Sequence, residues 1–297
     1  MHVLVTGGTG FIGSALLPAL KRRGDRITVL SRRSRENTRD VHYVTRLEAI
    51  GEPVDAVINL AGASLAEKRW TERYKAEMVA SRVGFTERLV NWMQAQAVAP
   101  RIFLSGSAIG YYGTSARDTF TEESLPGTGF AAELCQAWES AASVADDGHT
   151  RVATLRLGVV FDRDGGALTQ MMRSFHLGVG SWLGSGEQWL SWVHRSDVVR
   201  ALLFMLEDER VNGPVNMVAP NPVTHRQFCE ILSARKPTLF NAGVPGFLLR
   251  ALVGPMADEL LLSGQRVLPE KLEALGFEFR FESLDSALID ILARTKG

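Results

Sequence analysis

Over the first 160 residues, short apolar runs alternate with longer segments in which apolar residues recur every three to four positions. This alternation is typical of a parallel sheet covered by helices on both faces. Because parallel strands are joined by right-handed crossovers, we expect a Rossmann-type, doubly wound α/β fold. The pattern predicts strands at 2–6, 26–31, 41–44, 54–60, 101–105 and 151–157, and helices at 11–23, 72–97 and 130–145.

The pattern changes after residue 160, where glycines and tryptophans become frequent. Such a mixture is typical of loops and short elements that cover a ligand. Further helices are predicted at 196–206, 247–253, 269–275 and 284–293. We therefore expect a main domain at 1–160 to which 188–220 returns, a smaller α/β substrate lobe with lid loops at 161–246, and a helical C-terminal domain at 247–295.

Composition narrows the class of protein. Hydrophobic residues make up 45% and charged residues 22%, which suits a globular core. Lys+Arg and Asp+Glu both number 33, so no basic field favours nucleic acid, and no apolar run reaches the roughly 20 residues of a membrane span. The first strand leaves no room for a signal peptide, and Cys135 and Cys229 read as reduced thiols in helices. We expect a cytoplasmic monomer or homodimer that acts on a small molecule, without a metal site.

The strongest motif is a glycine-rich turn between the first predicted strand and helix. Its spacing is G-x-x-G-x-x-G, which combines a tight turn, a close approach of backbone to pyrophosphate and close helix packing. A glycine turn without a ligand is the alternative, but the position between strand and helix favours a dinucleotide site. The predicted contacts are Gly7, Thr9, Gly10, Phe11, Ile12 and Gly13.

A basic cluster follows the second strand, where binders of NAD place an acidic residue. Here the chain reads Ser31-Arg32-Arg33-Ser34-Arg35. A guanidinium can bind the 2′-phosphate of NADP(H) through two hydrogen bonds, so the sequence predicts NADP(H), with Arg32 and Arg33 as contacts. A solvated basic loop is the alternative. Small residues at strand ends predict further cofactor contacts at Leu60, Ala61, Gly62 and Ser105.

These motifs resemble the extended short-chain dehydrogenase/reductase superfamily. The chain is more similar still to its atypical branch of epimerase family proteins, over essentially the whole length. The resemblance implies a Rossmann domain, an NADP(H) site and a distinctive C-terminal domain. It rests on residues 6–13, 59–62, 68–71, 81–82, 105–113, 138–139, 156–160, 164–168, 188–194, 213–217 and 264–269.

The superfamily uses a Tyr-x-x-x-Lys pair in which the lysine lowers the pKa of the catalytic phenol, helped by a serine. Ser107 matches that serine. Phe130 and Leu134 stand where the tyrosine and lysine belong, and Arg82 stands where the assisting asparagine belongs. The resemblance therefore implies cofactor binding but not the superfamily's usual proton transfer.

Two adjacent tyrosines are the candidates to replace the lost phenol. Tyr111 and Tyr112 follow Ser107 at the end of a predicted central strand, where α/β proteins bind ligands, although packing explains such residues equally well. Candidate substrate contacts, each with a structural alternative, are Lys68, Arg69, Arg82, Trp192 and His194. We expect an NADP(H)-dependent reductase or epimerase-like enzyme; the alternative is a module that binds NADP(H) without turnover.

Overall fold

The largest element is a seven-stranded parallel sheet with strand order β12-β7-β5-β4-β1-β2-β3. The structure, a computed structural model, describes residues 1–65 and 67–293. All six predicted strands and the doubly wound fold are confirmed. The strands are β1 (His2–Thr6), β2 (Arg26–Leu30), β3 (Val41–Val44), β4 (Ala56–Asn59), β5 (Ile102–Ala108), β7 (Arg151–Leu157) and β12 (Gly213–Met217).

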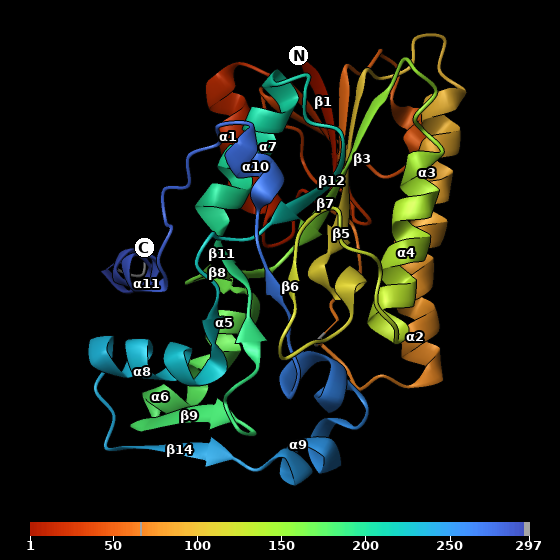
Figure 1. Ribbon diagram of the computed structural model, residues 1–297. Helices are drawn as coiled ribbons and strands as arrows, with labels where there is room; N and C mark the ends of the chain where they lie inside the picture. Colours follow the sequence, from red (N-terminus) through yellow and green to blue (C-terminus); the bar gives the residue numbers. More distant parts are fainter. Residues whose placement is uncertain (66, 294–297) are drawn as a thin grey trace.

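Helices cover both faces of this sheet (Figure 1). Val3 and Val5 point into the core shared with one set of helices, whereas Leu4 points into the core on the opposite face. Side chains alternate along a strand, so a strand buried on both faces is apolar throughout. One set contains α1 (Gly13–Arg23), α7 (Arg195–Glu207) and α10 (Glu270–Ala274), and the other contains α2 (Glu72–Val79), α3 (Phe85–Gln94) and α4 (Phe130–Ser143).

The helix predicted at 72–97 begins as expected, because the Thr71 hydroxyl accepts a hydrogen bond from Tyr74 N (3.2 Å). The prediction of one continuous α-helix is wrong, since residues Ala80–Gly84 form a π-helical turn between α2 and α3. A π turn inserts an extra residue and changes which side chains face inward. Arg82 lies in this turn.

The smaller lobe lies beyond the carboxyl ends of the parallel strands (Figure 1). It has a core of its own around Phe161, Trp192, Phe228 and Phe281. Its short strands pair in twos, β8 with β11, β9 with β14 and β10 with β13. The elements are β8 (Val159–Asp162), α5 (Gly166–Met171), α6 (Arg173–His176), β9 (Val179–Leu183), β10 (Trp189–Leu190), β11 (Trp192–His194), β13 (Val223–Thr224), α8 (His225–Arg235) and β14 (Phe240–Val244).

The C-terminal segment contains the short helices predicted for it: α9 (Gly246–Val253), α10 and α11 (Leu284–Ala293). A second π-helical turn spans Ala257–Leu261, and β15 (Arg266–Val267) pairs with β6 (Thr119–Phe120). The division into three domains stays a prediction, and residues 294–295 of the last lie outside the described residues. Cys135 and Cys229 are free and buried, and no helix in the described part of the chain could cross a membrane.

Candidate functional site

Two glycines of the turn between β1 and α1 are required by backbone packing. Gly7 has φ +67°, and a Cβ on it would lie 2.5 Å from the carbonyl oxygen of Leu60 at the end of β4. A Cβ on Gly13 would lie 2.3 Å from the carbonyl oxygen of Gly7. Contacts this short do not occur, so only glycine permits the turn to pack against β4 and α1.

The third glycine leaves the turn open on its outer side. Gly10 is exposed, and a Cβ there would meet only the Gly7 oxygen, at 3.1 Å. Within the described residues, the backbone N–H groups of Phe11 and Ile12 at the start of α1 have no hydrogen-bond acceptor. Free N–H groups at a helix N-terminus favour an anion. The turn can therefore hold a phosphate group.

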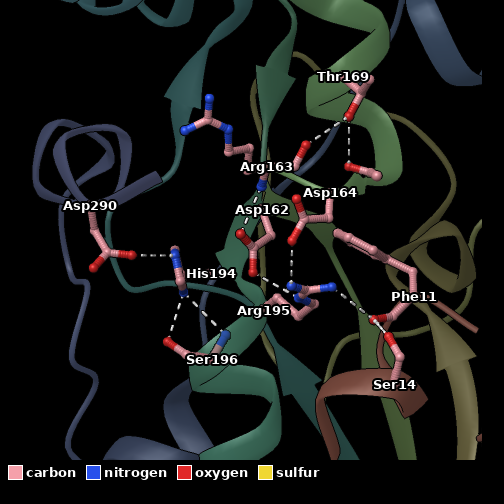
Figure 2. A network of polar contacts seen from close by, with 11 residues as sticks. Phe11, Ser14, Asp162, Arg163, Asp164, Thr169, His194, Arg195, Ser196 and Asp290 are labelled. Atoms are coloured by element: carbon pink, nitrogen blue, oxygen red, sulfur yellow. Dashed lines mark hydrogen bonds and ion pairs between the residues drawn. The ribbon is translucent and has the colours of Figure 1, made fainter. Parts of the chain in front are cut away.

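A cavity of about 520 Å³ lies against this turn, lined by Thr9, Gly10, Phe11, Ser14, Ala15, Asp164, Gly165 and Arg195. Figure 2 shows how Arg195 joins the turn to the loop after β8. Its Nε donates to Asp162 (2.7 Å), Nη2 lies 3.6 Å from an Asp164 oxygen, and Nη1 donates to the Phe11 carbonyl (3.3 Å). Its guanidinium also packs on the Phe11 ring, at 4.7 Å. The sequence did not indicate Arg195, because this residue belongs to no recognisable motif.

The other predicted cofactor contacts divide into exposed and buried ones. Arg32 and Arg33 follow β2 and are exposed, and neither guanidinium forms an ion pair within residues 1–65 and 67–293. Gly62 is exposed just after β4. Ser105, by contrast, is fully buried inside the sheet, where its hydroxyl accepts a hydrogen bond from Asn59 (3.3 Å). Its predicted contact with a cofactor has no support from this placement.

Asn59 organises the middle of the sheet and was not predicted as a functional residue. It is fully buried; its Oδ1 accepts from the Thr6 hydroxyl (2.6 Å) and its Nδ2 donates to Thr86 (2.9 Å). The indole of Trp138 on α4 also donates to the Thr86 hydroxyl (3.0 Å). This network fixes the ends of β1 and β4, and therefore the glycine turn, relative to α3 and α4.

Ser107 lies at the carboxyl end of β5 and is 1% exposed. Its hydroxyl donates to Glu139 Oε1 (2.6 Å), and both Glu139 oxygens accept from Arg156 (2.8 Å each). A serine proton bound to an ionised carboxylate is not available to a substrate carbonyl, but the oxygen can still accept. An arginine inside the apolar run Val152–Leu157 was the signal that could have indicated this buried pair.

The two candidate tyrosines lie in different surroundings. Tyr112 is 2% exposed; its hydroxyl donates to Asn216 Oδ1 (2.6 Å) and accepts from Arg156 (2.9 Å). Burial raises the pKa of Tyr112 to about 12. Tyr111 is half-buried with its ring against Arg156, whose guanidinium carbon lies 3.5 Å from the ring centre. Within the described residues its hydroxyl makes no hydrogen bond. Of the two hydroxyls, that of Tyr111 is therefore the one whose hydrogen-bonding capacity is unused in this part of the chain.

The positions of the lost Tyr-x-x-x-Lys pair lie in an apolar cluster. Phe130 packs edge-on against Trp70, with ring centres 5.2 Å apart. Leu134 belongs to the same cluster, together with Met78 and, from the C-terminal segment, Met256. No group at these two positions can transfer a proton.

Three basic residues predicted to bind substrate are distinguished by their partners. Lys68 is exposed and lies 3.7 Å from a Glu77 oxygen. Arg69 donates to the backbone carbonyls of Ala251 and Leu252, which ties it to α9. Arg82 is 8% exposed, and its Nη1 is buried without a partner. Of the three, Arg82 is the one with free hydrogen-bonding capacity inside the molecule.

Trp192 and His194 are both fully buried. Trp192 donates to the Asn221 carbonyl (3.1 Å) in the core of the lobe. His194 caps α7, with Nδ1 accepting from Ser196 N (3.1 Å), and its Nε2 lies 3.4 Å from Asp290 on α11 (Figure 2). Both side chains hold the lobe together, and their predicted contacts with substrate have no support from this placement.

Residues 3–218 match the family model described as NAD dependent epimerase/dehydratase family. The chain belongs to this family. A second model, a domain of unknown function (DUF1731), matches residues 244–291, which contain α9, α10 and most of α11. The strands of the parallel sheet all lie within residues 3–218, except that β1 begins one residue earlier, at His2.

Similar proteins match this chain over nearly their whole length. An epimerase family protein of Staphylococcus aureus (strain MRSA252) is 35% identical over 98% of this chain and 99% of its own. One of Mycobacterium leprae (strain TN) is 36% identical over 96% of this chain and 94% of its own. The crystal structure of human epimerase family protein SDR39U1 (isoform2) with NADPH is 34% identical, covers 98% of this chain and 99% of its own, and superposes with a TM-score of 0.91.

Proposed function

We propose that the protein is an NADP(H)-dependent reductase of a small molecule. The observation that carries this proposal is that, among the described residues, the N–H groups of Phe11 and Ile12 and the side chains of Arg32 and Arg33 after the next strand have no partner. The turn would bind the pyrophosphate and the arginines the 2′-phosphate. The similar human protein, crystallised with NADPH, supports the choice of cofactor.

The hydride would come from the bound cofactor, and the protein orients the substrate and supplies a proton. Ser107 can accept a hydrogen bond from the hydroxyl that forms as a carbonyl is reduced, because its own proton is bound to Glu139. Tyr111 donates the proton, since its hydroxyl is not bound to any described residue. A phenol without a neighbouring lysine gives a proton more readily than it takes one at neutral pH. This favours reduction over the oxidation with which an epimerisation begins.

The alternative is a module that binds NADP(H) without turnover, which the apolar cluster around Phe130 and Leu134 favours. A panel of carbonyl compounds and activated alkenes with NADPH distinguishes the two functions. A reductase turns over at least one of them, and Tyr111→Phe lowers kcat more than Tyr112→Phe does at equal fold stability. If the folded, NADPH-bound protein reduces none of them, the binding module is the better description.

The cofactor site is tested by replacing the arginines. Arg32→Ala should weaken NADPH binding by about 10- to 150-fold, the loss of a charge-assisted hydrogen bond worth about 1.5–3 kcal/mol, and leave NADH binding nearly unchanged. Cofactor fluorescence titrations give both affinities. Arg46→Ala, at a position after β3, is the matched control. An unchanged ratio of the two affinities in both Arg32→Ala and Arg33→Ala would contradict the assignment to NADP(H).

A further inference from the structure

Arg82 is a buried cation without a counter-charge. Its side chain is 8% exposed, and its Nη1 has no hydrogen-bond partner. No carboxylate among residues 1–65 and 67–293 forms an ion pair with it, and burial lowers the pKa of its guanidinium. Burying an unpaired charge opposes folding, whereas every other strongly buried arginine here has partners, as Arg156 does. A ligand that supplies the missing acceptor removes this penalty.

Three features of the surrounding chain hold the Arg82 side chain in this buried position. The π-helical turn Ala80–Gly84 directs it inward, and π turns inside α-helices are frequent at functional sites. Gly62 makes room for it, because a Cβ on Gly62 would lie 3.1 Å from the guanidinium carbon. The neighbouring Ser81 hydroxyl accepts from Ala63 N (3.1 Å) and fixes the loop after β4. These features keep the guanidinium at the carboxyl end of β4.

The guanidinium lies beside the residues of the proposed reductase site. It packs on the Trp138 ring at 5.1 Å, and Trp138 itself fits against Gly106, where a Cβ would lie 2.9 Å from the indole. Strands β4 and β5 are neighbours, with Asn59 opposite Ser105, so the residues that follow them lie at the same edge of the sheet. Gly62, which contacts the guanidinium, is exposed. Arg82 and Ser107 therefore lie at the carboxyl ends of two adjacent strands, where α/β proteins bind ligands.

We propose that Arg82 binds the carboxylate of the substrate, which makes the substrate a small organic acid. This rests on the proposed function, because the acid would lie beside the bound cofactor. A guanidinium matches a carboxylate with two parallel hydrogen bonds. One buried positive charge against the Trp138 ring suits a monoanion, and a phosphate dianion would keep an unpaired charge there.

Thermal unfolding of the NADP⁺-bound protein tests this with matched probes. Acetate and benzoate are each compared with their neutral isosteres, acetamide and benzamide. The acids should raise the melting temperature and the amides should not, because a ligand stabilises only the state that it binds. Inorganic phosphate is a third arm, and stabilisation by phosphate equal to that by the acids would overturn the choice of a carboxylate.

Arg82→Met, which keeps the packing on Trp138, should weaken acid binding at least about tenfold. Arg82→Lys should keep the preference for acid over amide with lower affinity, and it serves as the test if the methionine variant does not fold. Arg151→Met is the matched control, since Arg151 is also partly buried but donates to the backbone carbonyls of Met205 and Val211. Equal responses in wild type, Arg82→Met and Arg82→Lys would overturn the proposal.

NADPH affinity, measured on the same variants without acid, separates this proposal from the proposed function. If wild type binds NADPH but acids and amides stabilise it equally, the carboxylate site is wrong and the cofactor site stands. If Arg82→Met weakens NADPH binding and the acids have no effect on wild type, Arg82 belongs to the cofactor site. If wild type does not bind NADPH, the proposed function fails first.

Discussion

The glycine turn and the region around α4 lie at the same edge of the sheet, but different parts of the chain build them. In the turn, backbone atoms set the geometry: a Cβ on Gly13 would lie 2.3 Å from the Gly7 oxygen in the same segment, and one on Gly7 would lie 2.5 Å from the oxygen of Leu60 at the end of β4. Around α4, side chains from β5, β7 and α4 meet in the bonds between Ser107, Glu139 and Arg156. The first region therefore depends mostly on a local motif, and the second on side chains from three separate segments.

The two regions also differ in how their hydrogen-bonding groups are used. The turn leaves the N–H groups of Phe11 and Ile12 free within the described residues. Around α4 the hydroxyls of Ser107 and Tyr112 are already bound to protein. Free groups at the turn are suited to a ligand, and bound groups around α4 are suited to stability. Tyr111 and Arg82 are the exceptions, because each has a polar group that is not bound within the described residues, and our proposals for the α4 side depend on these two groups.

The largest expected effect tests whether the network around α4 is mainly structural. Arg156→Met leaves Glu139 buried without its ion-pair partner, so we expect the free energy of unfolding to fall by about 3–5 kcal/mol. Urea unfolding measures this. Arg235→Met is the control, because the Arg235–Asp285 pair is 41% and 45% exposed and should contribute less than about 1 kcal/mol. Similar losses in both variants would contradict the difference between buried and exposed pairs.

The turn was predictable because its glycine motif lies within eight residues, Thr6–Gly13, although the contact that constrains Gly7 comes from Leu60. The fold was predictable for the same reason, since apolar strands and amphipathic helices each have a local period. The burial of Arg82 was not predictable, because Lys68 and Arg69 carry the same charge nearby. What distinguishes Arg82 from the other two is the π turn, which interrupts the helix that was predicted as continuous. The position of the Arg82 side chain in turn depends on packing against Gly62 and Trp138.

The pairing of Ser107 was hidden for a related reason. Its partner Glu139 lies on α4 and is held by Arg156 on β7, so three separate segments must be placed before the bond exists. The apolar strand around Arg156 was a usable signal of a buried charge. It did not identify the partner, because periodicity gives the face of an element and not the residue opposite it.

The next largest expected effect is the pH dependence of stability that Tyr112 causes. Its pKa of about 12 in the folded state, caused by burial, exceeds the value of about 10 expected when unfolded. The unfolded protein therefore loses this proton first, so the stabilisation is complete below pH 10 and declines as pH rises toward 12, by about 2–3 kcal/mol. Urea unfolding between pH 8 and about 12 measures the decline.

Tyr112→Phe should be less stable than wild type at neutral pH by about 1–3 kcal/mol, because Asn216 loses its donor. Since phenylalanine has no proton to lose, the two stabilities should converge as pH rises above 10. Tyr111→Phe should keep the wild-type decline. Parallel pH curves for wild type and Tyr112→Phe would show that Tyr112 is not the buried phenol that the hydrogen bonds indicate.

The smallest expected effect separates structure from ligand binding within the turn itself. Gly13→Ala puts a Cβ 2.3 Å from the Gly7 oxygen, so we expect the free energy of unfolding to fall by about 1–3 kcal/mol. In Gly10→Ala the added Cβ lies 3.1 Å from the same oxygen, so the free energy of unfolding should change by less than about 1 kcal/mol.

The effect of Gly10→Ala should instead be on ligand binding, because its methyl group would lie where a pyrophosphate approaches the backbone. NADPH should therefore raise the melting temperature of wild type but much less that of Gly10→Ala. If NADPH stabilises Gly10→Ala as much as wild type, the cofactor does not lie on this turn. The turn would then differ from the α4 region in geometry but not in ligand binding.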